Sequence, residues 1–177
     1  GTNDEIRNCF YNFIFNNSDL NREDTMNLVK DKWIELKINY DNLIECGNTK
    51  KVFEFLRSKN IKIAICTSDD RNPTEKTIDI LNLNNYIDFI ACGDDNISSK
   101  PSPEPLWRIC NKLNVNVENT VMVGDTISDI HAGLNSKCGK IIGVLSGQYN
   151  GFNLDEADII LNNIDDIPNL FEKNLLL

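Results

Sequence analysis

The first 45 residues carry apolar side chains at the spacing of amphipathic helices. Apolar residues recur at steps of three and four along residues 4–16 and again along residues 22–38, with a polar stretch between the two segments. The apolar positions are Ile6, Phe10, Phe13 and Ile14 in the first segment and Met26, Val29, Trp33 and Leu36 in the second. This pattern predicts a helical hairpin over residues 1–45, although two helices of a larger core would have the same spacing.

From residue 46 onward, short apolar runs rich in β-branched residues alternate with helical patterns. The apolar runs occupy residues 61–67, 88–92, 120–124, 140–145 and 157–161. The helical patterns occupy residues 48–59, 73–83, 103–113 and 128–136. Apolar strands separated by helices are typical of parallel βαβ units whose sheet is covered on both faces. Residues 46–177 are therefore predicted to form a Rossmann-like α/β core, with any ligand site at the carboxyl ends of its strands.

Two carboxylates follow the strand predicted at 120–124. Asp125 and Asp129 are four residues apart, where the strand leads into a helix, so both side chains can point into one pocket. Hard carboxylate oxygens suit Mg²⁺, which keeps several waters and needs few protein ligands. The same residues would also serve simply as a helix cap and a favourable acid in the first helical turn.

Hydroxyl and ammonium groups follow two other predicted strands. Thr67 and Ser68 come at the end of the 61–67 strand, where hydroxyls and backbone N–H groups can hold a phosphate oxygen or simply form a turn. Lys100 stands before Pro101 in a proline-rich loop that leads into a helix. The prolines fix this loop locally, so the Lys100 ammonium can act as a fixed positive charge for a phosphoryl group.

The composition excludes several classes of partner. The formal net charge is −9, and no cluster of Lys and Arg offsets it, so a nucleic-acid partner is not expected. No apolar run approaches the roughly 18 residues of a membrane span, so a membrane partner is not expected either. The six cysteines form no CxxC pair, and several lie in apolar runs. They indicate buried thiols in a reducing, cytoplasmic protein rather than disulfides or a zinc site.

Three stretches of the chain resemble the motifs of a known family. The stretches ICTSDDR, SSKPSPEPL and VMVGDTISDIHAG contain Thr67, Lys100 and Asp125, each after a separate predicted strand. They closely resemble motifs II, III and IV of haloacid dehalogenase-like phosphatases, in particular the phosphoglycolate phosphatase-like branch. The resemblance covers about residues 46–171. It implies a Rossmann-like core with a small helical cap, of which residues 1–45 would be the whole or a part.

The resemblance also implies a chemistry. In this family an aspartate attacks a phosphate ester, and water then hydrolyses the aspartyl-phosphate. Thr67 and Ser68 would bind the transferring phosphoryl group, and Lys100 would neutralise its oxygens and orient the nucleophile. Asp125 would bind Mg²⁺, with Asp129 close by as a water-mediated ligand or as the partner of Lys100. The substrate would be a small phosphorylated metabolite, and the oligomeric state is left open.

The first motif of the family, a strand followed by Asp-x-Asp, is not recognisable in this chain. One interpretation is a degenerate copy in which residues 11–15 form the strand and Asn16 and Ser18 replace the two acids. The other is that Gly1 and Thr2 end the motif and that the natural protein extends upstream. The motif I strand of the family lies mid-sheet, so its loss would leave unpaired backbone on both neighbouring strands. A structure with residues 11–15 in the central strand would support the degenerate copy.

Two functions remain open at this point. The first is a Mg²⁺-dependent phosphomonoesterase whose nucleophile is missing from this chain, with a phosphoglucomutase-like activity as a variant that needs the same acids. The second is a catalytically inactive relative that binds a phosphorylated ligand or a partner. A dinucleotide-binding domain is disfavoured, because no GxGxxG follows any predicted strand.

Overall fold

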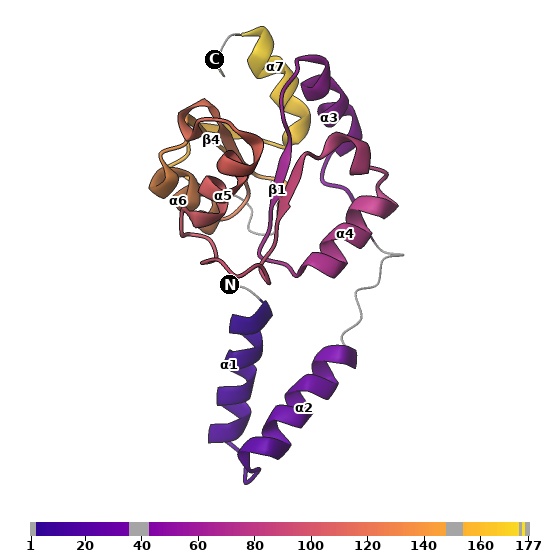
Figure 1. Ribbon diagram of the computed structural model, residues 1–177, viewed down its shortest axis with the longest axis vertical. Coiled ribbons are helices and arrows are strands. Elements are labelled where there is room, and N and C mark those ends of the chain that lie inside the picture. The colour runs from indigo at the N-terminus through magenta and orange to yellow at the C-terminus, as the bar shows by residue number, and fades with distance from the viewer. Residues whose placement is uncertain (1–2, 36–42, 148–153, 174, 176–177) are drawn as a thin grey trace.

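The structure is a computed structural model that describes residues 3–35, 43–147, 154–173 and 175, without the side chains of residues 3–5 and 33–35. A helical hairpin stands below an α/β core in Figure 1. The core contains the elements predicted from the sequence, although its strands are shorter than expected. The predictions for Gly1, Thr2, the side chain of Trp33, and Leu36 fall outside the described part of the chain.

The hairpin consists of α1 (Asn3–Asn16) and α2 (Arg22–Glu35), as the apolar spacing predicted. The two helices contact each other. Phe15 stacks on Tyr11 in α1, and the Arg22 guanidinium of α2 lies over the Phe15 ring. The predicted apolar positions of α1 are not its buried face, because Phe10 and Phe13 are 52% and 68% exposed. In α2, by contrast, the predicted apolar position Val29 is buried, and so is Thr25.

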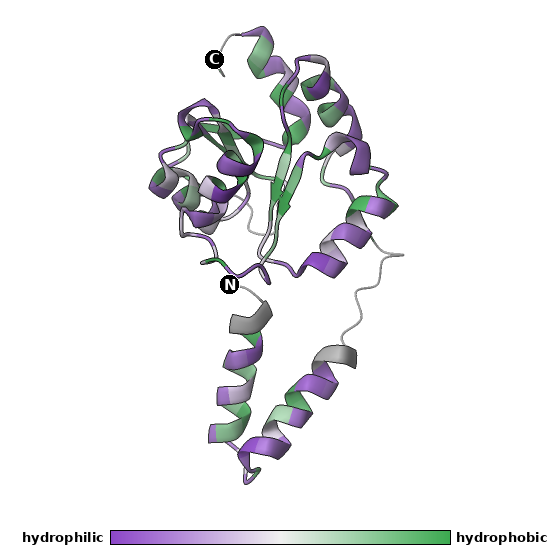
Figure 2. Ribbon diagram, in the orientation of Figure 1, coloured by the Kyte–Doolittle hydropathy of each residue, from purple (hydrophilic) through white to green (hydrophobic). Residues whose placement is uncertain are grey.

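From residue 49 to residue 144, helices and strands alternate in the core. The helices are α3 (Thr49–Ser58), α4 (Arg71–Ile80), α5 (Glu104–Leu113), α6 (Ile127–Ser136) and α7 (Ile167–Glu172). The strands are β1 (Ala64–Cys66), β2 (Phe89–Ala91), β3 (Val121–Gly124), β4 (Lys140–Val144) and β5 (Ile159–Leu161). Every pairing between strands is parallel, which confirms the predicted α/β architecture. Figure 2 shows β1 and β2 as hydrophobic ribbons among helices of mixed polarity.

The sheet is divided into two parts. β1 pairs with β2, and β3, β4 and β5 form a separate sheet in that order. Within the described residues, β1 and β3 therefore have one strand neighbour each. Their side chains are less covered than those of β4, which is buried from Ile141 to Val144, whereas Val121 of β3 is 40% exposed. A strand that lacks a second neighbour also lacks the cover that the side chains of that neighbour give.

Helices join the two parts of the sheet. α5 contacts β1 and β2 and also α6, while α3 contacts α7 on the side of the three-stranded sheet. In Figure 1, α5 and α6 lie to one side of β1, and α3 and α4 lie to the other. Leu106 of α5, Met122 of β3 and Ala132 of α6 form a buried cluster on which Cys66 of β1 packs. The carboxyl ends of β1 and β3 are thus held near each other without being hydrogen-bonded.

The degenerate first motif is contradicted by the structure. Residues 11–15 lie inside α1, and Asn16 is the last residue of that helix. The Ser18 hydroxyl donates a hydrogen bond to the Ile14 carbonyl at 2.8 Å, as part of the turn that follows. The apolar run had the spacing of a helix, and a helix satisfies its own backbone hydrogen bonds without a neighbouring strand. The central strand of the family is therefore not formed by residues 11–15.

No helix in the described ranges combines the length and the apolar character that crossing a membrane requires.

Candidate active site

The predicted site residues gather at the carboxyl ends of β1 and β3. Thr67 directly follows β1, and Asp125 directly follows β3. Lys100 lies in the loop between β2 and α5, and Asp129 lies in the first turn of α6. Parallel strands present their carboxyl ends at one edge of a sheet, which is why residues so far apart in the sequence converge here.

Lys100 forms the most buried contact of the site. Its ammonium donates hydrogen bonds to Asp129 Oδ1 at 2.6 Å and to the Cys66 carbonyl at 2.8 Å. The two charged side chains are only 11% and 6% exposed. The pair thus connects the loop before α5, the end of β1 and the start of α6. A buried ammonium held in this way is a fixed positive charge at the edge of the sheet.

Asp129 has two of the roles that the sequence suggested: it is an acid in the first turn of α6 and the partner of Lys100. Its Oδ2 accepts hydrogen bonds from the Thr126 N–H at 3.1 Å and from the Thr126 hydroxyl at 2.8 Å. The Thr126 hydroxyl accepts in turn from the Asp129 N–H, which completes a capping box at the start of α6. Both carboxylate oxygens therefore have donors, one from Lys100 and the other from Thr126.

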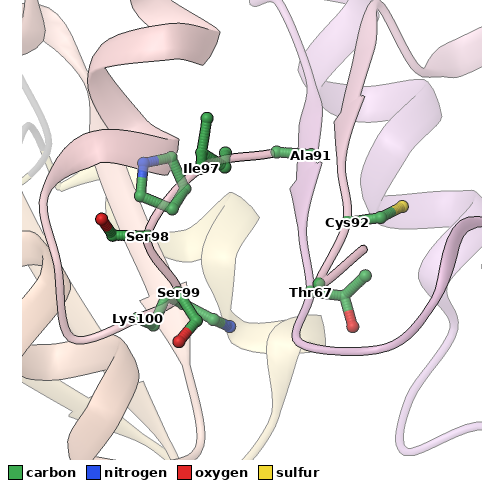
Figure 3. Close-up of a pocket in the computed structure, with 9 residues that line it drawn as sticks. Thr67, Ala91, Cys92, Ile97, Ser98, Ser99 and Lys100 are labelled. Carbon is green, nitrogen blue, oxygen red and sulfur yellow. The ribbon is translucent and has the colours of Figure 1, made fainter. Parts of the chain in front are cut away.

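The Thr67 hydroxyl is hydrogen-bonded within the turn that follows β1. The Thr67 hydroxyl accepts a hydrogen bond from the Asp69 N–H at 3.1 Å and donates one to Asp69 Oδ2 at 3.2 Å. The Thr67 N–H donates to the Ala91 carbonyl. A small pocket between this turn and the Lys100 loop is lined by Thr67, Ser99 and Lys100 among others. Figure 3 shows the Lys100 side chain pointing from its loop towards the strand that ends at Thr67. The pocket holds about 10 Å³, which is room for about one water and too little for a phosphoryl group.

Asp125 lies against the loop that follows β4. The backbone of Gly147 in that loop packs so closely on Asp125 that a methyl group at residue 147 would overlap the carboxylate. One hard carboxylate at a strand end fits Mg²⁺, which takes one or two protein carboxylates together with waters and substrate oxygens. The part of the chain that the structure covers holds no cluster of three or more His, Cys, Asp or Glu side chains. A metal bound at Asp125 would therefore need further oxygen ligands.

A set of contacts that the sequence analysis missed holds the Thr67 turn in place. Asp94 Oδ1 accepts from the backbone N–H of Arg71, the first residue of α4, at 2.9 Å, whereas the N-cap residue Asp70 makes no capping bond of its own. Asp95 Oδ1 accepts from the Arg71 guanidinium at 2.8 Å. Burial alone would raise the pKa of Asp95, but hydrogen bonds from Arg71 and the Cys92 N–H outweigh it and hold this pKa below its usual range.

The cysteine at the end of β1 is not set up as a nucleophile. Burial raises the pKa of the Cys66 thiol, and the nearby Lys100 ammonium does not compensate for it. A thiol with a raised pKa stays protonated at neutral pH and reacts slowly. A cysteine nucleophile at this edge of the sheet is therefore disfavoured. The groups that remain available for chemistry are hydroxyl, ammonium and carboxylate groups.

Known proteins share these features. The family model of the haloacid dehalogenase-like hydrolases matches residues 2–144. A phosphoglycolate phosphatase of Aquifex aeolicus is 32% identical over 123 residues, which are 70% of this chain and 57% of that protein. A phosphorylated carbohydrates phosphatase of Thermotoga maritima is 30% identical over 118 residues, 67% of this chain and 55% of that protein. The chain thus spans a little over half the length of these relatives.

Solved structures of similar fold agree with this relationship. A structure described as a predicted phosphoglycolate phosphatase, from Haemophilus somnus, superposes with a TM-score of 0.74 at 20% identity, over 88% of this chain and 70% of that one. A haloacid dehalogenase-superfamily hydrolase from Ehrlichia chaffeensis superposes with a TM-score of 0.63 at 26% identity, over 88% of this chain and 71% of that one. The first likeness concerns the fold alone.

Proposed function

Because the chain belongs to the haloacid dehalogenase-like hydrolase family, in its phosphoglycolate phosphatase-like branch, we propose that it provides most of the active site of a Mg²⁺-dependent phosphomonoesterase. The substrate would be a small phosphorylated metabolite, the class to which the named substrates of its relatives belong. The observation that carries the proposal is the buried contact of Lys100 with Asp129, beside Thr67 and Asp125 at one edge of the sheet.

Each residue would have a separate task. The Thr67 hydroxyl and the Ser68 N–H would bind the phosphoryl oxygens, and the Lys100 ammonium would neutralise their charge in the transition state. Asp125 would hold Mg²⁺, which offsets the repulsion between a carboxylate nucleophile and a phosphate dianion. Asp129 would act mainly by holding Lys100, since both its oxygens have protein donors, and would reach the metal only through a bridging water.

The nucleophile would come from a strand between β1 and β3. Within the described residues, β1 and β3 have no strand neighbour on those edges, and their carboxyl ends lead to Thr67 and Asp125. A parallel strand placed there would end beside both residues and could carry the attacking aspartate and a second one as general acid and base. We propose that a segment outside the described residues supplies this strand.

A second candidate function is a non-catalytic protein that binds a phosphorylated ligand. It is favoured by one observation: the first motif of the family, a strand followed by Asp-x-Asp, is not recognisable in the sequence, and the run 11–15 is helical. Such a protein would keep the phosphate-binding groups Thr67 and Lys100 but would not turn over a substrate. The two functions therefore differ in hydrolysis and agree in phosphate binding.

Hydrolysis of p-nitrophenyl phosphate with Mg²⁺ separates the two functions when it is measured on the chain together with a strand that carries the nucleophile. Turnover that is lost in Asp125→Ala and kept in Asp155→Ala, an exposed acid outside the site, would support the phosphatase and exclude the non-catalytic protein. Absent turnover in the presence of that strand, together with binding of inorganic phosphate that Lys100→Met abolishes, would favour the non-catalytic protein. If the chain neither hydrolyses the ester nor binds phosphate, both proposals fail.

A further inference from the structure

Two glycines outside the quoted motifs II to IV lie against the candidate site. Gly93 follows β2, and Gly147 lies in the loop after β4. Neither has a positive φ, so the backbone conformation alone would accept another residue at either position. The reason for a glycine must therefore be the space that a side chain would take.

At residue 147, that space belongs to Asp125. A methyl group on Gly147 would overlap the Cβ, Cγ and Oδ2 atoms of Asp125. Gly143 in β4 provides a comparison, because a methyl group there would lie 3.2 Å from Leu154, a contact that a small adjustment relieves. The carboxylate of Asp125 thus rests directly on the Gly147 backbone, and a side chain at residue 147 would displace it.

At residue 93, the space belongs to the turn after β1. A methyl group on Gly93 would overlap the Ser68 carbonyl oxygen, and backbone cannot move aside as a flexible side chain can. The Gly93 N–H also donates a hydrogen bond to the Asp69 carbonyl at 2.7 Å. The next residue, Asp94, accepts from the Arg71 N–H. The loop after β2 therefore fixes the backbone of Ser68 and Asp69 from the outside.

We propose that Gly93 and Gly147 are positioning residues that serve the two halves of the site separately. Gly147 sets the place of the Asp125 carboxylate and thereby the affinity for a divalent cation. Gly93 sets the place of the Thr67–Ser68 turn and thereby the affinity for a phosphate group. The proposal rests on the proposed function, because it takes Asp125 as the metal ligand and this turn as the phosphate-binding segment.

Three single substitutions test this separation. Gly147→Ala is expected to weaken binding of Mn²⁺, used as a spectroscopically visible divalent cation, by about tenfold or more, and to leave binding of inorganic phosphate within about twofold. Gly93→Ala is expected to weaken phosphate binding by about tenfold and to spare Mn²⁺. Gly139→Ala is the control: a methyl group there would overlap the Glu118 carbonyl at the amino ends of the strands, and both affinities should stay unchanged.

The wild-type protein provides a measurement that does not depend on the folding of any variant. In amide NMR spectra, Mn²⁺ should broaden the Gly147 resonance at lower concentrations than that of Gly93, and inorganic phosphate should shift the Gly93 resonance. The Gly139 resonance should respond to neither ligand. The reverse order, or an equal response of Gly93 and Gly147 to both ligands, would overturn the inference.

Failure of this inference is distinguishable from failure of the proposed function. If the wild-type protein binds both ligands and Gly147→Ala binds Mn²⁺ as tightly as it does, only the positioning role is wrong. It is also wrong if Gly139→Ala weakens Mn²⁺ binding as much as Gly147→Ala, because the effect would then follow general destabilisation. If the wild-type protein binds neither Mn²⁺ nor phosphate, the proposed function fails and the positioning role fails with it.

Discussion

Removal of Asp129 should destabilise the protein through Lys100. Asp129→Ala leaves the Lys100 ammonium its hydrogen bond to the Cys66 carbonyl but removes its carboxylate partner, in a place where the side chain of Lys100 is 11% exposed. It also removes the acceptor of the Thr126 N–H and hydroxyl. Lys100→Met has a smaller expected effect, because the Asp129 carboxylate keeps both donors of Thr126.

The expected loss in the free energy of unfolding follows from the distance and the burial of the Lys100–Asp129 pair. Two unit charges 2.6 Å apart attract by about 6 kcal/mol at an effective dielectric constant of about 20, before the cost of removing both from water. Because that cost offsets much of the attraction, the intact pair adds little net stability. Loss of one partner leaves the other charge buried without compensation, which costs about 3–5 kcal/mol. We therefore expect Asp129→Ala to lower the free energy of unfolding by about 3–5 kcal/mol and Lys100→Met by about 2–3 kcal/mol.

A double-mutant cycle measured by urea unfolding at neutral pH checks this reasoning. The double variant should be more stable than the sum of the two single losses predicts, by about 1–3 kcal/mol, since it leaves no unpaired buried charge. The control cycle uses Arg57 and Asp88, whose side chains are 40% and 24% exposed, with an expected coupling below about 1 kcal/mol. If the coupling between Lys100 and Asp129 is below about 0.5 kcal/mol, the pair is not held as described.

Three further changes have defined expectations. The lowered pKa of Asp95 contributes stability above pH 3.8, its ordinary value, and loses it as the pH falls further. Urea unfolding should therefore show a steeper loss of stability in acid for the wild-type protein than for Asp95→Asn. Asp158→Ala removes the acceptor for the first buried N–H of β4, at 2.7 Å, and should cost about 1–2 kcal/mol in thermal unfolding, whereas Asp155→Ala should cost nothing measurable. Ile142→Val, fully buried, should cost about 0.5–1.5 kcal/mol in urea unfolding, and Ile160→Val, 44% exposed, much less.

The type of each element was predictable because apolar spacing carries that information over long segments. The five strands and the helices between them were found from the alternation of apolar runs and helical patterns. α7 (Ile167–Glu172) was missed because its six residues are too few to show a helical period. The run at residues 11–15 allowed both a strand and a helix, since apolar residues there are nearly continuous. The run is helical because it belongs to a longer segment, Asn3–Asn16, whose apolar residues have helical spacing and which packs on α2.

The site was predictable only as far as residue types could be placed at strand ends. Thr67, Lys100 and Asp125 could be found because each follows a strand, and the parallel topology then brings them together. The sequence left two roles open for Asp129, a water-mediated metal ligand or the partner of Lys100. The distance from the Lys100 ammonium to Asp129 shows that the two residues are partners. Gly93 and Gly147 could not be assigned a role, because a glycine in a sequence does not reveal which atom lies where its side chain would be. That information arises from the packing of loops far apart in the chain.

Among the described residues, β1 and β3 each have one edge without a strand neighbour, and these two open edges predict a pattern of backbone protection that can be checked directly. In a parallel strand, alternate residues direct their N–H groups to opposite edges. The Thr67 N–H pairs with β2, so the Cys66 N–H faces the other edge. The bond from the Lys140 N–H to the Thr120 carbonyl likewise assigns the Met122 N–H to β4 and the Val123 N–H to the open edge.

Hydrogen exchange followed by NMR should therefore alternate along both strands. The amides of Cys66 and Val123 should exchange about tenfold or more faster than those of Thr67 and Met122, because local fluctuations suffice to release them. Equal protection of all four amides would mean that some segment already pairs with these edges, and the divided sheet would then be wrong. If a strand that carries the nucleophile is added to the protein, Cys66 and Val123 should become protected as phosphatase activity appears. Completion of the sheet and of the site would then be the same event, since the strand that pairs with both edges would also place the acid between Thr67 and Asp125.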